Sequence, residues 1–444
     1  MEKARILAGK RKGAAAIELM KKAAARAPGD SRLLIDVGDL YKQLGRGDEA
    51  LEYYRRGLQA AQRPSDRAFA LSTIALTYRE RKNWPEYLTY AKQFVQLASS
   101  GKIPLSQEMK ALSLFHQGAI LSQEDDYDRA LSMAEQSVDL FSNDYIKFEA
   151  LLLLADINAK IGNMAEVTKY AVQAGELLPN DPWQQRKVGE FFAGLNQMDE
   201  ALTYYRRFLA LGKDGHDRAM GYATLAGAYQ RMGRQEKYIE NAKLYLETVS
   251  SLGDEATDDQ KGNWGYYYGE IMTAEKKPEE AYKGYSTAVK YLRDKYRLSE
   301  TYGKMARHNA KIGNRDLARE QALKAAELMP GEYWRVKDAV DILIDLKEYD
   351  LAIEVIDKAP ANESDFYLLR SVVYQRADKR PEAIEASKDY IDSLRAGLVN
   401  LSPRSVGDGE LKLWEALRST GELTRLPPGM LLEIHYAGMI HLRP

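Results

Sequence analysis

The sequence predicts an all-α protein built from about ten tandem helix–turn–helix units and a short C-terminal segment that does not follow the repeat. Three observations lead to this fold class. Apolar residues recur with the 3.6-residue period of amphipathic helices. A small residue is followed twelve positions later by a residue that is usually alanine. Glycine or proline punctuates the predicted helix ends, and strand-like alternation is nearly absent before residue 395.

The first complete unit shows how the two helices are recognised. LLIDVGDLYKQLG (33–45) predicts the first helix, and DEALEYYRRGLQ (48–59) predicts the second. Glycine adopts the left-handed conformation that ends a helix without steric cost, so we expect caps at Gly45, Gly162, Gly233 and Gly313. Prolines at 28, 179 and 330 follow second helices and stop them.

The units are themselves arranged in a duplicated block. Their small or crossing residues are Gly38, Ala75, Gly118, Ala155, Gly189, Ala226, Gly269, Ala306, Val340 and Ser371. The intervals 37, 43, 37 and 34 occur twice in succession, and DEALEYYRR (48–56) returns as DEALTYYRR (199–207). We therefore expect a helical array over 1–395, with a truncated repeat (1–37), a four-repeat block (38–188), its duplicate (189–339) and two last repeats (340–395).

These units resemble the tetratricopeptide repeat family, whose pattern places a small residue at position 8, an aromatic residue at 11 and alanine at 20. Gly189, Phe192 and Ala201 fill these positions in one unit, and Tyr205 and Phe208 fill positions 24 and 27. The resemblance implies a right-handed α-solenoid whose first helices line a concave groove. It also implies that position 8 lies where the two helices of a unit cross, so that only small side chains fit there.

The two ends depart from the repeat. The first residues supply only the last turns of a helix, so we expect that the chain begins inside a longer protein. The basic residues of 1–27 are expected to form a solvated face rather than a lipid or nucleic-acid site. Residues 396–444 are expected to form a capping helix, LKLWEALRST, and a tail in which Leu432, Ile434 and Tyr436 alternate like a strand.

Composition argues against most catalytic and cofactor chemistry. The 444 residues contain no cysteine, which excludes disulfides, thiolate metal sites and cysteine nucleophiles. Phosphate loops, zinc-protease motifs and the glycine fingerprint of dinucleotide binding are missing. His435, His441 and Glu433 could share one face of a strand, but an exposed tail is favoured over a metal site. We predict no catalytic residue, no cofactor site and no metal site, and therefore no enzyme.

The charges exclude a global attraction to nucleic acid, since 64 basic and 65 acidic side chains leave a net charge of −1. No run of about 18 apolar residues predicts a membrane-spanning helix. The compartment stays open: the chain shows no signal peptide, which favours the cytoplasm, whereas a fragment of a longer protein would also suit the periplasm.

The groove positions implied by the resemblance give the candidate partner-binding residues. They are Trp183, Arg186, Arg231, Tyr266, Arg307, Trp334 and Lys337. Aromatic and arginine side chains in a concavity are typical binding residues. The favoured alternative is that both tryptophans pack under the preceding repeat's second helix, and Trp264, Tyr267 and Tyr268 are likewise expected to be core rather than a carbohydrate or peptide platform. A clamp for chaperone tails is disfavoured, because Asp341 follows Lys337 where such clamps use asparagine.

The sequence thus predicts a non-enzymatic scaffold that binds a protein or an extended peptide within a larger assembly. Two alternatives stay open. Long arrays resembling this one occur in bacterial exopolysaccharide synthesis, export and secretion machineries, which would give the chain a partner in polysaccharide machinery. The repeats could also regulate another domain of a larger protein.

Overall fold

The computed structural model describes residues 3, 6, 13–101, 103–359 and 364–398, which form 21 α-helices and one short 3-10 helix without any strand. The predicted all-α fold class is confirmed for this part of the chain. The expected tail, with Leu432, Ile434 and Tyr436, lies outside the described residues, as does nearly all of the predicted segment 396–444.

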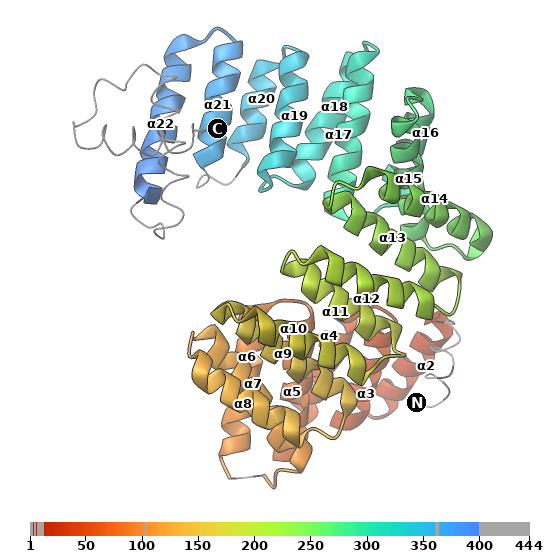
Figure 1. Cartoon of the computed structure of the whole chain (residues 1–444), viewed down its shortest axis with the longest axis vertical. Helices are drawn as coiled ribbons and strands as arrows, with labels where there is room; N and C mark the ends of the chain where they lie inside the picture. Colours follow the sequence, from red (N-terminus) through yellow and green to blue (C-terminus); the bar gives the residue numbers. More distant parts are fainter. Residues whose placement is uncertain (1–2, 4–5, 7–12, 102, 360–363, 399–444) are drawn as a thin grey trace. The chain divides into compact units, whose positions relative to one another are not determined.

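The chain divides into two compact units, Met1–Leu211 and Gly212–Pro444. The first unit contains α2 (Gly13–Arg26), α3 (Ser31–Gln43), α4 (Gly47–Ala60), α5 (Pro64–Glu80), α6 (Trp84–Ser99), α7 (Gln107–Gln123), α8 (Tyr127–Leu140), α9 (Asp144–Ile161), α10 (Met164–Leu177), α11 (Pro182–Gly194) and α12 (Met198–Leu211). Consecutive helices form hairpins that pack on the next hairpin (Figure 1).

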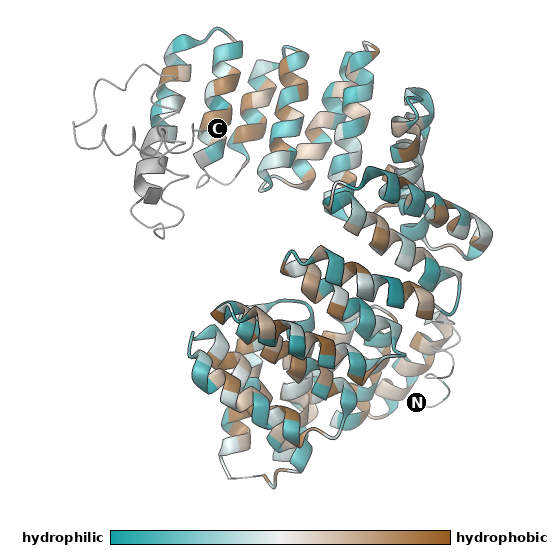
Figure 2. Ribbon diagram, viewed as in Figure 1, coloured by the Kyte–Doolittle hydropathy of each residue, from teal (hydrophilic) through white to brown (hydrophobic). Residues whose placement is uncertain are grey.

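The second unit continues the same plan. It contains α13 (Gly215–Arg231), α14 (Gln235–Leu252), η1 (Gly253–Glu255), α15 (Asp258–Ala274), α16 (Pro278–Tyr291), α17 (Lys295–Lys311), α18 (Arg315–Leu328), α19 (Tyr333–Asp345), α20 (Tyr349–Asp357), α21 (Ser364–Arg376) and α22 (Arg380–Leu398). The helices carry both hydrophobic and hydrophilic residues (Figure 2), so apolar stripes can pack between neighbouring helices while polar residues face solvent.

A left-handed turn ends the first helix of every complete unit. Gly45, Gly162, Gly233 and Gly313 have φ between 67° and 86°, which confirms the predicted caps. The other six units place Lys82, Asp125, Asn196, Lys276, Lys347 and Asp378 at the same turn, with φ from 55° to 60°. These ten positions follow one another at the intervals 37, 43, 37, 34, 37, 43, 37, 34 and 31, so the sequence period is also a backbone period.

Helix boundaries also recur at an interval of 151 residues. The helices α3, α11 and α19 start at 31, 182 and 333, and α4 and α12 start at 47 and 198. Each long step contains a turn with a left-handed glycine, Gly101 in one copy and Gly253 in the other. The border between the two compact units, after residue 211, lies one repeat beyond the predicted block border at 188. The duplicate therefore contributes helices to both compact units.

The predicted close crossing of the two helices is confirmed at three glycines. A Cβ atom at Gly38 would lie 2.4 Å from the Tyr54 ring, and one at Gly189 would lie 2.6 Å from the Tyr205 ring. At Gly118 it would lie 3.1 Å from the carbonyl oxygen of Ala130. A larger residue here would overpack the crossing. The buried tyrosine rings use the space that glycine leaves, and the core of each hairpin lies at this crossing.

Candidate functional site

Two equivalent helices each present a tryptophan, a cation and an acid on one face. Trp183 is the second residue of α11, and Trp334 is the second residue of α19. Three residues later stand Arg186 and Lys337, which pair with acids four residues further on: Arg186 with Glu190 at 2.8 Å and Lys337 with Asp341 at 2.6 Å. Residues three and four apart share a helix face. We call Trp183–Arg186–Glu190 and Trp334–Lys337–Asp341 the tryptophan rows.

The first turn of α11 is fixed by its own sequence. Asp181 is the N-cap, and its carboxylate accepts hydrogen bonds from the backbone N–H groups of Trp183 and Gln184 at 3.0 and 3.1 Å. Pro182 occupies the first helical position, where its missing N–H costs nothing. The tryptophan is therefore held on the first turn of a well-capped helix.

Both tryptophans are exposed. Trp183 retains 46% of its accessible surface, with its ring 5.7 Å from Phe208 on the second helix of the same hairpin and 5.8 Å from the Arg186 guanidinium. Trp334 retains 71% and makes an edge contact with Tyr333 at 5.1 Å. The alternative of packing under the preceding repeat is wrong for Trp334, because so little of its surface is covered. Exposed tryptophan surface is costly in water and is typical of binding sites.

Tyr266 is the predicted site residue that the structure corrects. Only 2% of its surface is exposed, its hydroxyl donates to Glu300 at 3.0 Å, and the Arg297 guanidinium lies 5.0 Å from its ring. Burial, together with the charge of Glu270, raises the pKa of Tyr266 well above its ordinary value. Its ring is thus part of the core and not a contact for a partner.

The aromatic residues next to Tyr266 in α15 are Trp264, Tyr267 and Tyr268, and they differ in burial. Tyr267 is 1% exposed, so its predicted role in the core is confirmed. The Trp264 ring stacks on Tyr268 at 5.2 Å with an interplanar angle of 6°, and both side chains are half-buried. The cluster therefore serves packing, within α15 and against α13 and α14 of the preceding hairpin.

Partly buried carboxylates occupy equivalent positions in the two copies and connect first helices. Glu149 on α9 accepts from Arg79 on α5 at 2.9 Å and from Lys187 on α11 at 2.7 Å. Burial alone would raise the pKa of Glu149, but the charges of Lys187 and Arg79 hold it below its ordinary value. The equivalent Glu300 lies 3.3 Å from both Lys304 and Arg335. The pairs Glu149–Lys187 and Glu300–Arg335 connect successive hairpins, and the pair Arg79–Glu149 connects α5 to α9 across one intervening hairpin.

The second unit also contains a pocket of about 560 Å³ between α15, α16 and α17. Its lining residues are Thr273, Lys276, Pro278, Ala281, Tyr282, Tyr285, Lys304, Arg307, His308 and Lys311. The Tyr282 ring stacks on His308 at 4.8 Å, and the Tyr285 hydroxyl donates to Glu270 at 2.6 Å. The predicted residue Arg307 therefore lines a pocket with an aromatic wall and several cations.

The other predicted residues are more scattered. Arg231 is exposed at the end of α13. Three of the lining residues were not predicted. Lys276 lies just after the end of a first helix, Lys304 lies at a first-helix position outside the expected groove positions, and Tyr282 lies on a second helix. The signal that could have found them is the comparison of the two copies, since Lys276, Lys304 and Tyr282 stand where the first copy has Asp125, Leu153 and Leu131.

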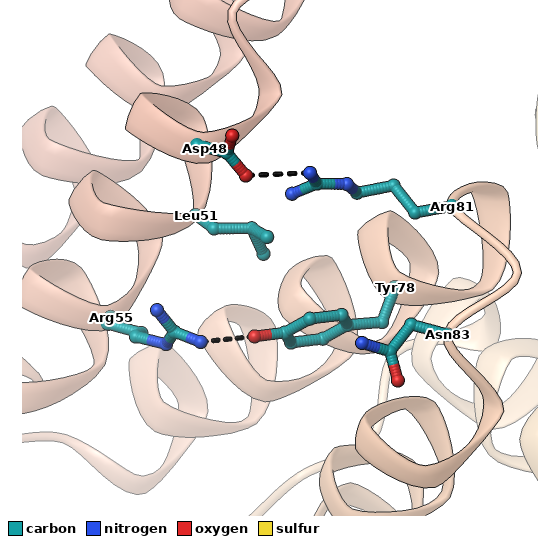
Figure 3. Close-up of a pocket in the computed structure, with 6 residues that line it drawn as sticks. All are labelled: Asp48, Leu51, Arg55, Tyr78, Arg81 and Asn83. Carbon is teal, nitrogen blue, oxygen red and sulfur yellow. Dashed lines mark hydrogen bonds and ion pairs between the residues drawn. The ribbon is translucent and has the colours of Figure 1, made fainter. Parts of the chain in front are cut away.

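A pocket of about 430 Å³ in the first unit has a different character (Figure 3). Arg81 pairs with Asp48 at 2.6 Å, and Arg55 donates to the Tyr78 hydroxyl. Both guanidinium groups are thus engaged by residues that line the pocket themselves. We interpret these contacts as structural, because they hold α4 against the end of α5.

The described residues offer neither a metal site nor a membrane-spanning helix. Within the described residues, no group of three or more His, Cys, Asp or Glu side chains could hold a metal ion, and His435, His441 and Glu433 lie outside them. None of the described helices is both long and apolar enough to cross a membrane.

A match to a known family supports the repeat assignment for the first part of the chain. A family model described as tetratricopeptide repeat matches residues 7–73. No curated protein sequence matches the chain. Among solved structures, a chain in the structure of Naa15/Naa10 bound to HypK-THB is 15% identical to this chain. The match covers 96% of this chain and 75% of the other, with a TM-score of 0.31. YrrB, described as a TPR protein with an unusual peptide-binding site, is 18% identical to this chain. The match covers 49% of this chain and 97% of YrrB, also with a TM-score of 0.31.

Proposed function

We propose that this tetratricopeptide-repeat chain is a protein-interaction scaffold whose tryptophan rows contact an extended peptide or a protein. The observation that carries the proposal is the repetition of an exposed tryptophan, a cation three residues later and its paired acid on α11 and α19. The two rows lie 151 residues apart in the sequence, at equivalent positions of the duplicated block.

The physical chemistry of the rows suits recognition of a polypeptide. A tryptophan offers a large apolar surface at a small cost in side-chain entropy, and it is enriched among the residues that dominate binding energy. The adjacent cation is already paired, so it can donate a further hydrogen bond to a backbone carbonyl or a carboxylate of the partner without burying an isolated charge. The rows would therefore supply both apolar area and polar specificity.

The test is a pull-down in which the purified chain is the bait for proteins from its source cells. Trp183→Ala and Trp334→Ala, singly and together, are compared with Met164→Ala and Leu317→Ala. These controls remove apolar residues that are 41% and 44% exposed on the second helices α10 and α18. We expect the double tryptophan variant to lose the specific partner and both controls to retain it. Recovery of the same partners by all variants would refute the role of the tryptophan rows.

The sequence-based alternatives remain predictions. A role in polysaccharide machinery would be supported by a change in tryptophan fluorescence on titration with a glycan, because Trp183 and Trp334 are exposed. A regulatory role would require a further domain in the same gene product.

A further inference from the structure

We propose that the pocket between α15, α16 and α17 binds an acidic peptide segment, holding one apolar side chain while Lys276 and Lys311 pair with neighbouring carboxylates. We call it the second-copy pocket. The inference rests on the proposed scaffold function and deepens it by naming the chemistry of one partner segment. It concerns a site other than the tryptophan rows.

The shape of the pocket fits a side chain of a partner. A volume of about 560 Å³ lies within the range of roughly 300–1,000 Å³ that is usual for ligand sites. Pro278, Ala281, Tyr282 and Tyr285 provide an apolar wall on α16. The Tyr282 hydroxyl accepts hydrogen bonds from Asn309 and Gln321, both at 3.3 Å, which fixes this ring and turns its face toward His308. The wall is therefore formed before a partner binds.

The charges around the pocket favour an acidic partner. Lys304 is paired with Glu270 at 2.5 Å and Arg307 with Asp338 at 2.7 Å, so both cations are largely compensated. His308 faces Glu279 at 3.8 Å.

Two cations remain. Within the described residues, Lys276 and Lys311 have no ion pair, both are exposed, and no carboxylate lines the pocket. A carboxylate at its mouth would meet two uncompensated ammonium groups.

The duplicated block supplies an internal comparison. The helix bounds are nearly the same in the two copies, with α7 and α15 starting at 107 and 258, and α9 and α17 starting at 144 and 295. The positions of Lys276, Lys304, Arg307 and His308 are filled in the first copy by Asp125, Leu153, Asp156 and Ile157. At the position of Lys311 the first copy has Lys160, which donates to the backbone and side-chain oxygens of Ser122, both at 3.1 Å.

The two copies therefore share their helix positions but not the basic side chains that line the pocket. Lys276 is not needed for the turn, because the first copy forms the same turn with Asp125, and Lys311 does not make the contact to a neighbouring helix that its counterpart Lys160 makes. A recognition role for the acquired cations explains why the second copy differs here. The apolar wall and only two available cations favour a polypeptide over the closely spaced phosphates of a nucleic acid.

The experiment measures fluorescence polarisation with a labelled hexapeptide in which Leu-Phe is flanked on each side by Glu-Asp. Its partner probes replace Glu-Asp by Gln-Asn, or Leu-Phe by Ser-Ser, and a dodecameric oligothymidylate tests nucleic acid. The protein variants are Lys276→Asp and the control Lys347→Asp. Lys347 occupies the same left-handed turn two repeats later, with φ 60° against 59° at Lys276, and lies outside the pocket.

We expect the wild-type chain to bind the acidic Leu-Phe peptide more tightly than the other three probes. Lys276→Asp should weaken this binding by about tenfold or more, and Lys347→Asp should leave it within about twofold. Asp125 already adopts the turn conformation, so Lys276→Asp is expected to fold, and circular dichroism would verify it.

The pocket proposal fails if the amide peptide or the oligothymidylate binds as well as the acidic peptide, or if Lys276→Asp and Lys347→Asp behave alike. It also fails if the acidic peptide does not bind the wild-type chain. None of these results affects the tryptophan rows, which are tested separately through Trp183→Ala and Trp334→Ala. Loss of partners in that pull-down would likewise leave the peptide assay unchanged, so the two failures can be distinguished.

Discussion

Lowering the pH from 7 to 5 is expected to destabilise the first compact unit by about 2 kcal/mol, because His116 is buried in its neutral form. The side chain has no exposed surface; its Nε2 atom lies 3.1 Å from the Ser72 hydroxyl and its Nδ1 atom 3.2 Å from the Tyr87 hydroxyl. Burial, assisted by the positive charge of Arg79, lowers the pKa of His116 to about 3.

The sign follows from comparing the two states. The histidine has an ordinary pKa of 6.5 in the unfolded chain and one near 3 in the fold, so the unfolded chain binds more protons between these values. The stabilisation is present above pH 6.5 and is lost as the pH falls toward 3. The buried carboxylate of Glu149 contributes little between pH 7 and 5, since its ordinary pKa is 4.5 and its folded pKa is lower.

The second copy of the block suggests the variant that removes this pH dependence. At the positions of Ser72, Tyr87 and His116 it has Ala223, Tyr238 and Tyr267. Tyr267 is buried there and its hydroxyl donates to the carbonyl oxygen of Ala223 at 3.4 Å. The double variant Ser72→Ala, His116→Tyr is therefore expected to fold and to lose the titrating group.

Urea unfolding at pH 7, 6 and 5, with amide hydrogen exchange in α5 and α7 as the local measurement, checks this prediction. The wild-type chain should lose protection in these helices at low pH, and the double variant should lose much less. Equal losses in both proteins would show that other groups cause the acid sensitivity.

Much of the fold could be predicted because its signals are local and repeated. The glycine caps follow from the backbone freedom of residues such as Gly162 and Gly313, and each unit repeats the evidence of the last. The six turns without glycine were not predicted. At Lys276 or Lys347, a left-handed conformation that costs about 1 kcal/mol is imposed by the packing of the two helices and leaves no mark in the local sequence.

The candidate site was harder to predict because exposure depends on neighbouring hairpins. Trp183, Trp334 and Tyr266 were all expected at partner-binding positions, yet only the tryptophans are exposed. Tyr266 is covered because Arg297 on the next first helix lies over its ring, a contact between residues 31 positions apart. The second-copy pocket likewise combines three helices. A single unit read alone contains no information on such contacts.

Gly265→Ala is expected to destabilise the second compact unit by up to about 3 kcal/mol. At this glycine of α15, a Cβ atom would lie 2.6 Å from the backbone nitrogen of Ala288 and 2.7 Å from the carbonyl oxygen of Gly284 on α16. Gly284 is equally constrained, because its Cβ would lie 2.6 Å from the backbone nitrogen of Gly269. Backbone atoms cannot rotate away as a side chain can, so α15 and α16 would have to separate.

Gly303→Ala in α17 is the matched control, because no atom lies within 4 Å of the position that its Cβ would occupy. Alanine is a better helix former than glycine, so this variant should be more stable by about 0.5–1 kcal/mol. Urea unfolding should thus shift in opposite directions for the two substitutions. The first copy has Leu114 and Met133 at the positions of Gly265 and Gly284, so the contact between backbones belongs to the second copy.

The same substitution connects packing to the second-copy pocket. Thr273 on α15 and Tyr285 on α16 line that pocket, and Thr273 Oγ1 lies 3.0 Å from the Tyr285 hydroxyl. Separation of the two helices would break this contact, so Gly265→Ala should weaken binding of the acidic peptide under conditions in which the protein stays folded. Gly303→Ala should leave the affinity unchanged. If Gly265→Ala proved as stable as the wild-type chain, the close glycine contact would not limit how α15 and α16 pack.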